Sequence, residues 1–259
     1  MGYLMEQSHY SLVEWLPIFF QQWPDSQLVP GDESDKTNID SMKLAEFFNQ
    51  LSLSLKTVQH RALFFDPWEV AELGRKEVRN TSVLAWILDP EGTHGFGRVP
   101  LKTLLELICQ TKTDIPEDYT QYCRVLVETN PLGDNTNRVD IEIDADNFFL
   151  LIEVKIDAKE QQGQIERYCT DAKIRAKLGP KSRPWAVIFL TPHGGRPLTM
   201  GASFKPEDVP CISWQQLAAA LAFSLQEHYQ ALVAGGQSST SHQSAAHAAF
   251  CFLKRISTF

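Results

Sequence analysis

At 259 residues and 43% hydrophobic content, the chain can bury a full core as one large domain, or as one domain with a smaller appendage. Its formal net charge of −8 argues against a protein that coats nucleic acid without sequence preference, because that affinity comes mainly from Lys and Arg side chains neutralising phosphates. The 5 cysteines are scattered and never stand in a C-x-x-C spacing, which argues against a disulfide framework and against a structural zinc site.

The first residues show no pattern typical of a targeting segment. Glu6 and Glu14 are acidic and Pro17 interrupts the apolar run at 15–20, so neither a secretory signal nor an Arg-rich transit peptide is expected. No apolar stretch approaches the roughly 20 residues that span a bilayer. We therefore expect a cytoplasmic protein without a membrane partner.

Residues 1–60 are expected to form an N-terminal helical extension of a main domain that covers 61–259. Helical patterns are found at 9–22 and at about 39–55. Acidic residues dominate this extension, whereas basic residues dominate 155–183, so a local basic face is expected despite the acidic total. The helices at the two ends offer surfaces for a second copy of the chain or for a protein partner.

The main domain is expected to begin with helices. Asp66 followed by Pro67 is typical of an N-cap and the first residue of a helix, which continues to about residue 73. A second helix ends before Pro90, because apolar residues recur at helical spacing up to that point. The pattern leaves open whether this helix starts near Glu77 or only at Asn80.

From about residue 120 the hydrophobic period changes from 3.6 residues to 2. Three consecutive strands are predicted at 122–129, 138–144 and 148–155, forming a meander. The other predicted elements are a glycine-rich turn at 91–97, a helix at 99–111, a helix at 161–178, strands at 185–190 and 210–213, a helix at 214–227, a flexible loop at 234–244 and a final helix to about 256.

The turn between the second and third strands fixes their pairing. Residues 145–147 read as a tight hairpin, so residues whose numbers sum to 292 or 293 face each other. In the second register Asp140 lies opposite Glu153, with Cβ atoms about 5 Å apart on the same face. Lys155 shares that face, because side chains two positions apart on a strand point the same way.

Two carboxylates and an ammonium group are thus expected at the end of a buried strand. One interpretation is an ordinary ion pair at the point where the strand reaches water. The other is a metal site, because carboxylates this close repel each other unless a cation lies between them, and hard oxygen ligands suit Mg²⁺ or Mn²⁺. A lysine beside such a metal can orient or deprotonate water and can stabilise charge in a transition state.

The next helix presents Gln164 and Tyr168 on one face, because they stand four positions apart. Two interpretations remain open for this pair. Either the glutamine is exposed and the tyrosine packs in the core, or both lie on the substrate side of the site.

Asp140, then Glu153-Val154-Lys155, then Gln164 and Tyr168 together resemble the PD-(D/E)XK nuclease superfamily, with the Q-x-x-x-Y helix of its helicase-associated exonuclease branch. Upstream, residues 77–90 and the pair His94-Gly95 resemble the first helix of uncharacterised bacterial members. The resemblance covers roughly residues 72–191.

This resemblance implies a restriction-endonuclease-like α/β fold with an αβββαβ core, a mixed central sheet flanked by helices, and extra helices at both ends. It also implies that the metal ligands are Asp140, Glu153 and the Val154 carbonyl, and that Lys155 is the catalytic lysine. Glu77 is implied to be the helix acid, which contributes to the metal site through a water or directly. The chain departs from the pattern at Val139, where the family name has proline.

Two further positions are ambiguous. Glu72 competes with Glu77 for the role of helix acid. His94 fits a hydrogen-bonding residue of the glycine-rich turn better than a catalytic base.

The function implied by the resemblance is Mg²⁺- or Mn²⁺-dependent hydrolysis of phosphodiester bonds in DNA, in bacterial restriction or phage defence. We expect contacts to backbone phosphates from Arg167, Lys173, Arg175 and Lys177. Two alternatives are a nuclease fold that binds nucleic acid or regulates without turnover, and a nuclease that acts on RNA.

Overall fold

A computed structural model describes residues 40–60, 65–133, 137–179, 181–233 and 240–259. The chain divides into two compact units, residues 1–65 and 66–259, and the boundary expected near residue 60 stays a prediction. In the first unit the helix expected at 39–55 is α2, Ser41–His60. The helix expected at 9–22 lies outside the described residues.

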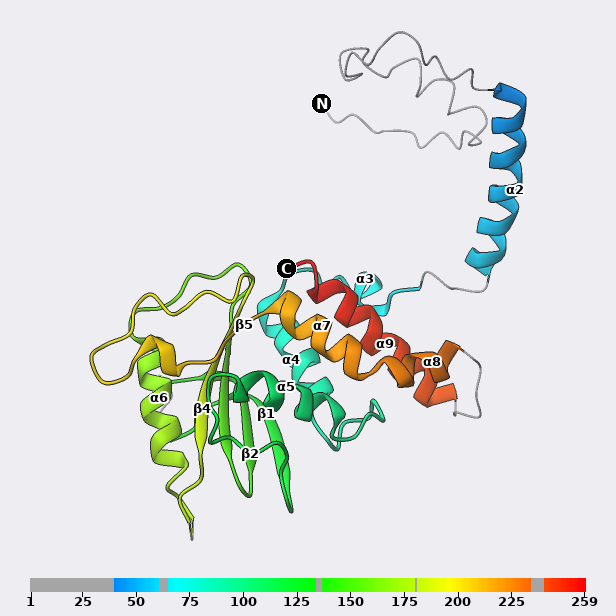
Figure 1. Cartoon of the computed structure of the whole chain (residues 1–259). Helices are drawn as coiled ribbons and strands as arrows, with labels where there is room; N and C mark the ends of the chain where they lie inside the picture. Colours follow the sequence, from blue (N-terminus) through cyan, green and yellow to red (C-terminus); the bar gives the residue numbers. More distant parts are fainter. Residues whose placement is uncertain (1–39, 61–64, 134–136, 180, 234–239) are drawn as a thin grey trace, which may run out of the picture. The chain divides into compact units, whose positions relative to one another are not determined.

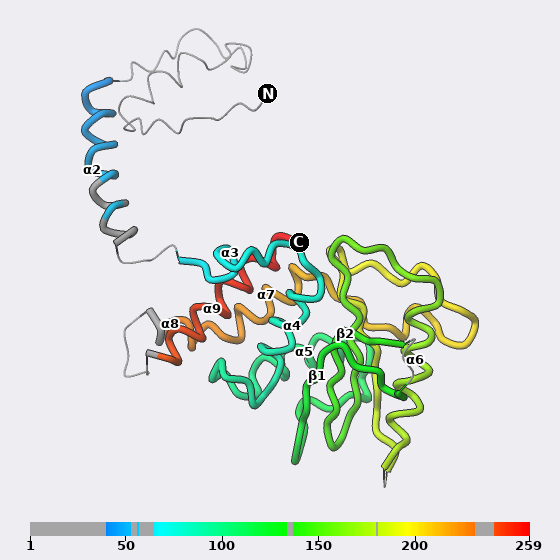
Figure 2. Tube along the Cα trace, turned by 180° about the vertical axis from the view of Figure 1, so that it is seen from behind, coloured from blue at the N-terminus to red at the C-terminus, as the bar shows by residue number. Residues whose placement is uncertain are grey.

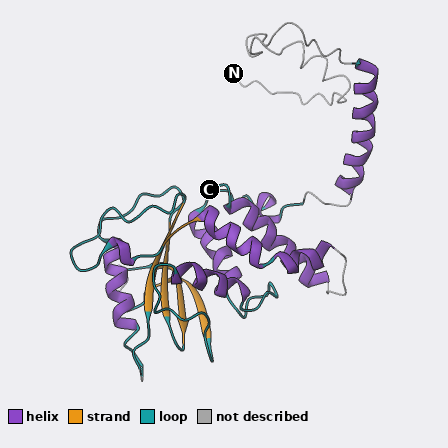
Figure 3. Cartoon of the chain, viewed as in Figure 1, coloured by secondary structure: helices purple, strands orange, loops and turns teal. Residues whose placement is uncertain are grey.

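The second unit is built on one mixed sheet of five strands (Figures 1 and 3). The sheet has the spatial order β1-β2-β3-β4-β5, with antiparallel pairing from β1 to β3 and parallel pairing from β3 to β5. The strands are β1 Cys123–Thr129, β2 Val139–Ala145, β3 Phe149–Val154, β4 Trp185–Thr191 and β5 Cys211–Ser213. The meander and the two later strands are therefore confirmed.

The register between β2 and β3 is the one that aligns the two acidic residues. Ile141 pairs with Ile152, and the Ala145 N–H donates to the Phe148 carbonyl at 3.1 Å, so the paired numbers sum to 293. Continuing this register by one residue places Asp140 opposite Glu153. The turn consists of Asp146 and Asn147.

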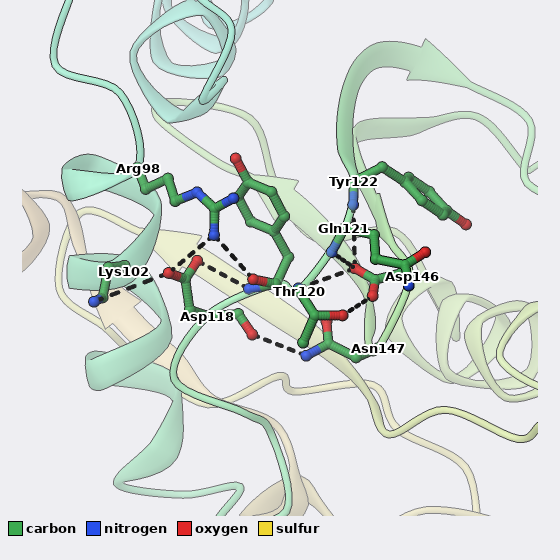
Figure 4. Close-up of polar contacts among 9 residues, drawn as sticks. Arg98, Lys102, Asp118, Thr120, Gln121, Tyr122, Asp146 and Asn147 are labelled. Atoms are coloured by element: carbon green, nitrogen blue, oxygen red, sulfur yellow. Dashed lines mark hydrogen bonds and ion pairs between the residues drawn. The ribbon is translucent and has the colours of Figure 1, made fainter.

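Side chains of the turn fasten it to the segment that enters β1 (Figure 4). The Asp146 carboxylate accepts the Thr120 hydroxyl and the backbone N–H groups of Thr120, Gln121 and Tyr122. The Asn147 amide donates to the Asp118 carbonyl at 2.9 Å. These contacts hold the three antiparallel strands together at the end of the sheet away from Asp140.

Helices cover both faces of the sheet, as the two opposite views in Figures 1 and 2 show. One face packs against four helices and forms the larger core. The other face packs against α6 and forms a smaller core. The larger layer contains α4 Glu77–Leu88, α5 Val99–Cys109, α7 Trp214–Ser224 and α9 Thr240–Ile256, and α6 is Gln164–Arg175.

Alternation along β3 decides which side chains belong to which core. Leu150, Ile152 and Val154 contribute to the larger core, whereas Phe149 and Leu151 contribute to the smaller core beside α6. Glu153 continues the second series, because side chains two apart share a face. The acidic pair therefore lies on the face that α6 covers.

Several helix boundaries differ from the sequence expectation. The helix of 161–178 begins only at Gln164, because Gly163 has a left-handed backbone with φ 65°. The helix expected at 214–227 is two helices, α7 and α8 Gln226–Val233. The predicted end of the loop at 234–244 was wrong, because α9 already begins at Thr240. The remaining short elements are α3 Pro67–Val70, capped by Asp66 as expected, and a 3-10 turn η2 Pro206–Asp208.

Candidate active site

Asp140 and Glu153 lie side by side where β2 begins and β3 ends. Glu153 is 1% exposed, and Asp140 is half-buried. Asp140 accepts the Val154 N–H at 2.7 Å through Oδ2, which ties its carboxylate to the end of β3. The structure thus brings together the three residues that the sequence pattern predicts as metal ligands.

Lys155 forms an ion pair with Oε1 of Glu153, and its side chain is also buried. The second oxygen of this carboxylate, Oε2, is buried without a hydrogen-bond partner within the described residues. A buried acceptor left in this state costs free energy, about 1–3 kcal/mol, unless a ligand uses it. Within the described residues Glu153 therefore has one oxygen paired with lysine and one that makes no hydrogen bond of normal geometry, in a carboxyl group that also interacts with Asp140 and Tyr168.

Burial and charge shift the protonation of all three groups. Burial raises the pKa of Glu153 to about 8 and the charge of Asp140 acts in the same direction, whereas Lys155 opposes both. Burial also raises the pKa of Asp140, against the hydrogen bond from Val154 and the charge of Lys155. For Lys155 burial lowers the pKa, but the attraction of Glu153 outweighs it and the net shift is upward. A divalent cation between the carboxylates would lower the pKa of both.

Glu77 is the first residue of α4 and reaches the same site. Its Oε2 accepts the Ile156 N–H at 3.0 Å, and its charge acts on both Asp140 and Lys155. Glu72 lies outside the helix, in a turn where it has φ 50°, and its carbonyl accepts the ammonium of Lys76. The geometry therefore favours Glu77 over Glu72 as the helix acid.

Gln164 and Tyr168 are both buried, on the face of α6 that covers the acidic pair. The Gln164 amide donates to the Tyr168 hydroxyl at 3.0 Å, and this hydroxyl donates to the Arg138 carbonyl. Burial raises the pKa of Tyr168, and the negative charge of Glu153 adds to the shift. The expectation of an exposed glutamine was wrong; the pair lies beside the site.

His94 is not part of this group. Its Nδ1 accepts the Phe96 N–H at 2.9 Å, and its Nε2 lies 2.9 Å from the Asp89 carbonyl, which it reaches as a donor in the neutral tautomer. Burial lowers the pKa of His94, so the neutral ring is favoured. These contacts support the interpretation of His94 as a residue that holds the glycine-rich turn.

The donor set fits a hard divalent cation. Within the described residues no group of three or more His, Cys, Asp or Glu side chains is arranged to hold a metal ion. Mg²⁺ does not require such a group, because it binds through one or two carboxylates and takes waters and substrate phosphate oxygens for the rest. Asp140, the unpartnered Oε2 of Glu153 and the Val154 carbonyl offer that kind of partial shell.

Comparison with known proteins agrees with this geometry. A family model described as the PD-(D/E)XK nuclease superfamily matches residues 64–247, which is most of the chain. The chain belongs to the PD-(D/E)XK nuclease superfamily. No curated protein and no solved structure matches it.

Membership in the PD-(D/E)XK nuclease superfamily implies nuclease activity on a nucleic-acid substrate, and enzymes of this superfamily generally use divalent metal ions. The αβββαβ order expected of such nucleases is present as α4, β1, β2, β3, α6 and β4, with α5 inserted after α4. No helix in the described part of the chain is long and apolar enough to cross a bilayer.

Two further residues contact the backbone next to the candidate site, and the sequence did not predict either contact. The Trp214 indole N–H donates to the Lys155 carbonyl at 2.9 Å, although the two residues are 59 positions apart. Arg75 forms an ion pair with Asp157 at 2.8 Å, just beyond the lysine. Of these two residues only Arg75 could have been suspected from the sequence, because it stands two residues before Glu77.

The basic residues that were expected to contact phosphates differ in their surroundings. Arg175 forms ion pairs with Glu142 at 3.2 Å and with Asp144 at 3.4 Å, so its guanidinium is already engaged. Arg167 donates to the Asn137 side chain at 3.2 Å and to the Gln162 carbonyl at 2.9 Å. The two lysines of this set, Lys173 and Lys177, are exposed.

Proposed function

We propose that this protein is a Mg²⁺- or Mn²⁺-dependent deoxyribonuclease that hydrolyses phosphodiester bonds. The observation that carries the proposal is the buried Glu153 carboxylate directly beside Asp140, with one oxygen paired to Lys155 and the other making no hydrogen bond in the part of the chain that the structure describes. A structural ion pair alone gives no reason to place a second acid at this point, because the second charge raises the cost of burying the first.

Asp140, Glu153 and the Val154 carbonyl would hold the cation. The bound ion would supply Lewis-acid activation of the scissile phosphate and of the attacking water. Lys155 would donate to the water or to the phosphate oxygens, where its positive charge would stabilise the added negative charge of the transition state. Water attacks phosphorus, the P–O ester bond breaks, and the leaving oxygen takes up a proton.

Glu77 and the pair on α6 complete the proposed site. Glu77 contributes through the backbone of Ile156 or through a water, because its carboxylate already accepts that N–H. Gln164 and Tyr168 line the site from the opposite side, and the unpartnered Oε1 of Gln164 is a further acceptor for a substrate or a water.

DNA backbone contacts are proposed for Arg167, Lys173 and Lys177, whereas a contact from Arg175 would require its ion pairs to break. Lys173 is about 14 Å from Gln164 along the helix axis, because each residue adds 1.5 Å. A strand bound at the site would therefore have to follow α6 to reach it. We further propose a cytoplasmic role in restriction or phage defence, which rests on the family resemblance alone.

The test is incubation of the purified protein with linear and circular single- and double-stranded DNA, and with RNA, in Mg²⁺, Mn²⁺ or EDTA. We expect metal-dependent DNA cleavage that falls about 100-fold or more in Asp140→Ala and in Lys155→Ala. Asp114→Ala and Lys254→Ala are matched controls at exposed positions, and both should cleave at the wild-type rate.

Three results would change the proposal. Cleavage that survives both active-site substitutions, or that persists in EDTA, would overturn the mechanism. Cleavage of RNA alone would replace the substrate. Retention of duplex DNA without any cleavage would favour a binding or regulatory protein with a nuclease fold.

A further inference from the structure

Lys155 lies just beyond the last residue of β3, where only part of the backbone still forms hydrogen bonds with the neighbouring strand. Its N–H still donates to the Leu190 carbonyl of β4 at 2.8 Å. Its carbonyl instead points to the helical layer and accepts the indole N–H of Trp214 at 2.9 Å. Both peptide planes that flank the Lys155 Cα are therefore held by hydrogen bonds, which fixes the direction in which the lysine side chain leaves the backbone.

The two residues after the lysine are also held from outside the sheet. Glu77 accepts the Ile156 N–H at 3.0 Å. Arg75 donates to both carboxylate oxygens of Asp157 at 3.0 Å and to the Ile156 carbonyl at 3.4 Å. The segment 155–157 is thus clamped by side chains that come from the start of α4 and from the start of α7.

Trp214 is itself held in place by aromatic packing. It is the first residue of α7 and is 0% exposed. The ring of Phe259 packs edge-on against it, with centroids 5.5 Å apart and an interplanar angle of 79°. The guanidinium of Arg75 lies over the same Phe259 ring at 4.9 Å. Phe259 therefore contacts two of the three side chains that hold the segment after β3, Trp214 and Arg75.

We propose that Trp214, backed by Phe259, is a positioning residue for Lys155. Its hydrogen bond sets the orientation of the peptide from which the lysine reaches back two residues to Glu153. This inference rests on the proposed function, because it concerns the lysine that acts there. Displacement of a catalytic group by about 1 Å can cost 100-fold in rate, so the hydrogen bond affects turnover more than substrate binding.

A purely structural tryptophan is the competing explanation, and removal of the N–H alone separates the two. Trp214→Phe keeps an aromatic ring against Phe259 but loses the donor to Lys155. Trp68 offers a matched control, because its indole N–H donates to the Ala248 carbonyl at 2.6 Å and its ring packs edge-on against Phe252 at 6.2 Å. Trp68→Phe therefore loses the same kind of contact without touching the segment after β3.

The experiment compares the full-length wild type, Trp214→Phe, Trp68→Phe and Phe259→Leu. We expect Trp214→Phe to lower the maximal cleavage rate about 10- to 100-fold with unchanged KM, and Phe259→Leu to lower it less. Trp68→Phe should cleave at the wild-type rate. Thermal unfolding of all four proteins controls for the loss of packing that the two tryptophan variants share.

A second measurement does not depend on cleavage. In NMR spectra of protein with isotope-labelled lysine side chains, the Lys155 signal is assigned by its disappearance in Lys155→Arg. That signal should shift in Trp214→Phe and stay in place in Trp68→Phe. If the wild type cleaves nothing, the proposed function fails and this signal still tests the positioning.

Two outcomes would overturn the inference. In the first, Trp214→Phe leaves both the Lys155 signal and the cleavage rate as they are in the wild type. In the second, Trp214→Phe and Trp68→Phe reduce cleavage equally, in proportion to their loss of stability, which is the behaviour of a tryptophan that only fills the core.

Discussion

The hydroxyl of Tyr168 satisfies two other polar groups at once. It accepts from the Gln164 amide at 3.0 Å and donates to the Arg138 carbonyl, and the tyrosine is 2% exposed. Arg138 stands two residues before Asp140, so this contact joins α6 to the start of β2 beside the acidic pair. A tyrosine that only packed in the core would not need its hydroxyl.

Tyr168→Phe is expected to lower the free energy of unfolding by about 1–3 kcal/mol, because the buried Gln164 amide and the Arg138 carbonyl lose the hydroxyl that bonds to both. It is also expected to slow cleavage, since the strand that carries Asp140 loses its contact with α6. Urea unfolding measures the first effect. Tyr122→Phe is the control, because Tyr122 is 53% exposed and should tolerate the change. Equal stability of Tyr168→Phe and wild type would contradict the prediction.

At the scale of elements, the β2–β3 hairpin depends on one carboxylate. Slight burial raises the pKa of Asp146, but hydrogen bonds from the Thr120 hydroxyl and from the N–H groups of Gln121, Thr120 and Tyr122 outweigh it, and the pKa is lowered. Figure 4 shows these donors converging on the carboxylate. Since this turn fixes the register, the same contacts support the alignment of Asp140 with Glu153.

A lowered pKa in the folded protein gives stability that is present above the unfolded pKa of about 3.9 and is lost as the pH falls through the folded value. Asp146→Asn should therefore unfold at a lower temperature than the wild type near neutral pH, and the difference should shrink below about pH 4. Thermal unfolding across this pH range measures the effect, with the exposed Asp114→Asn as the control for a change of one charge. A difference that stays constant with pH would show that the hydrogen bonds of the carboxylate are not its cause.

Periodicity identified the helices of the main domain but not their ends. Glu77 begins α4 although the apolar pattern starts only later, and Leu225 separates α7 from α8 inside one apolar stretch. At the start of α4 one contact comes from elsewhere in the chain, since Glu77 accepts the Ile156 N–H. A local pattern cannot contain such a contact.

At the scale of the whole molecule, the net charge is negative although basic residues dominate segment 155–183. Part of that basic charge is used inside the fold, since Arg175 pairs with Glu142 and Asp144, and Arg183 pairs with Asp144 at 2.6 Å. Glu142 is 3% exposed, so its carboxylate is shielded from water and pairs with Arg175. The cations still available to a nucleic acid are fewer than the sequence suggests.

Arg175→Ala is expected to lower the free energy of unfolding by about 2–3 kcal/mol, because it leaves the buried Glu142 carboxylate without its cation. Lys177→Ala should leave stability unchanged and should reduce the salt dependence of DNA binding by about one phosphate contact. Urea unfolding and DNA binding at several salt concentrations distinguish the two roles. The prediction would be contradicted if Arg175→Ala were as stable as the wild type and bound DNA as weakly as Lys177→Ala. Arg175 would then be a DNA-contacting residue.

The sequence by itself determined the family, the order of strands along the chain, and a hairpin turn that allows two registers, of which the structure selects the one that aligns Asp140 with Glu153. These follow from local patterns, because alternation and turn length act over a few residues. Only the tertiary structure decided that Glu77 rather than Glu72 reaches the site, that Arg175 is engaged in ion pairs, and that Trp214 holds the backbone of Lys155. Each of these contacts joins residues more than 30 positions apart, and their meeting depends on how α4, α6 and α7 pack on the sheet.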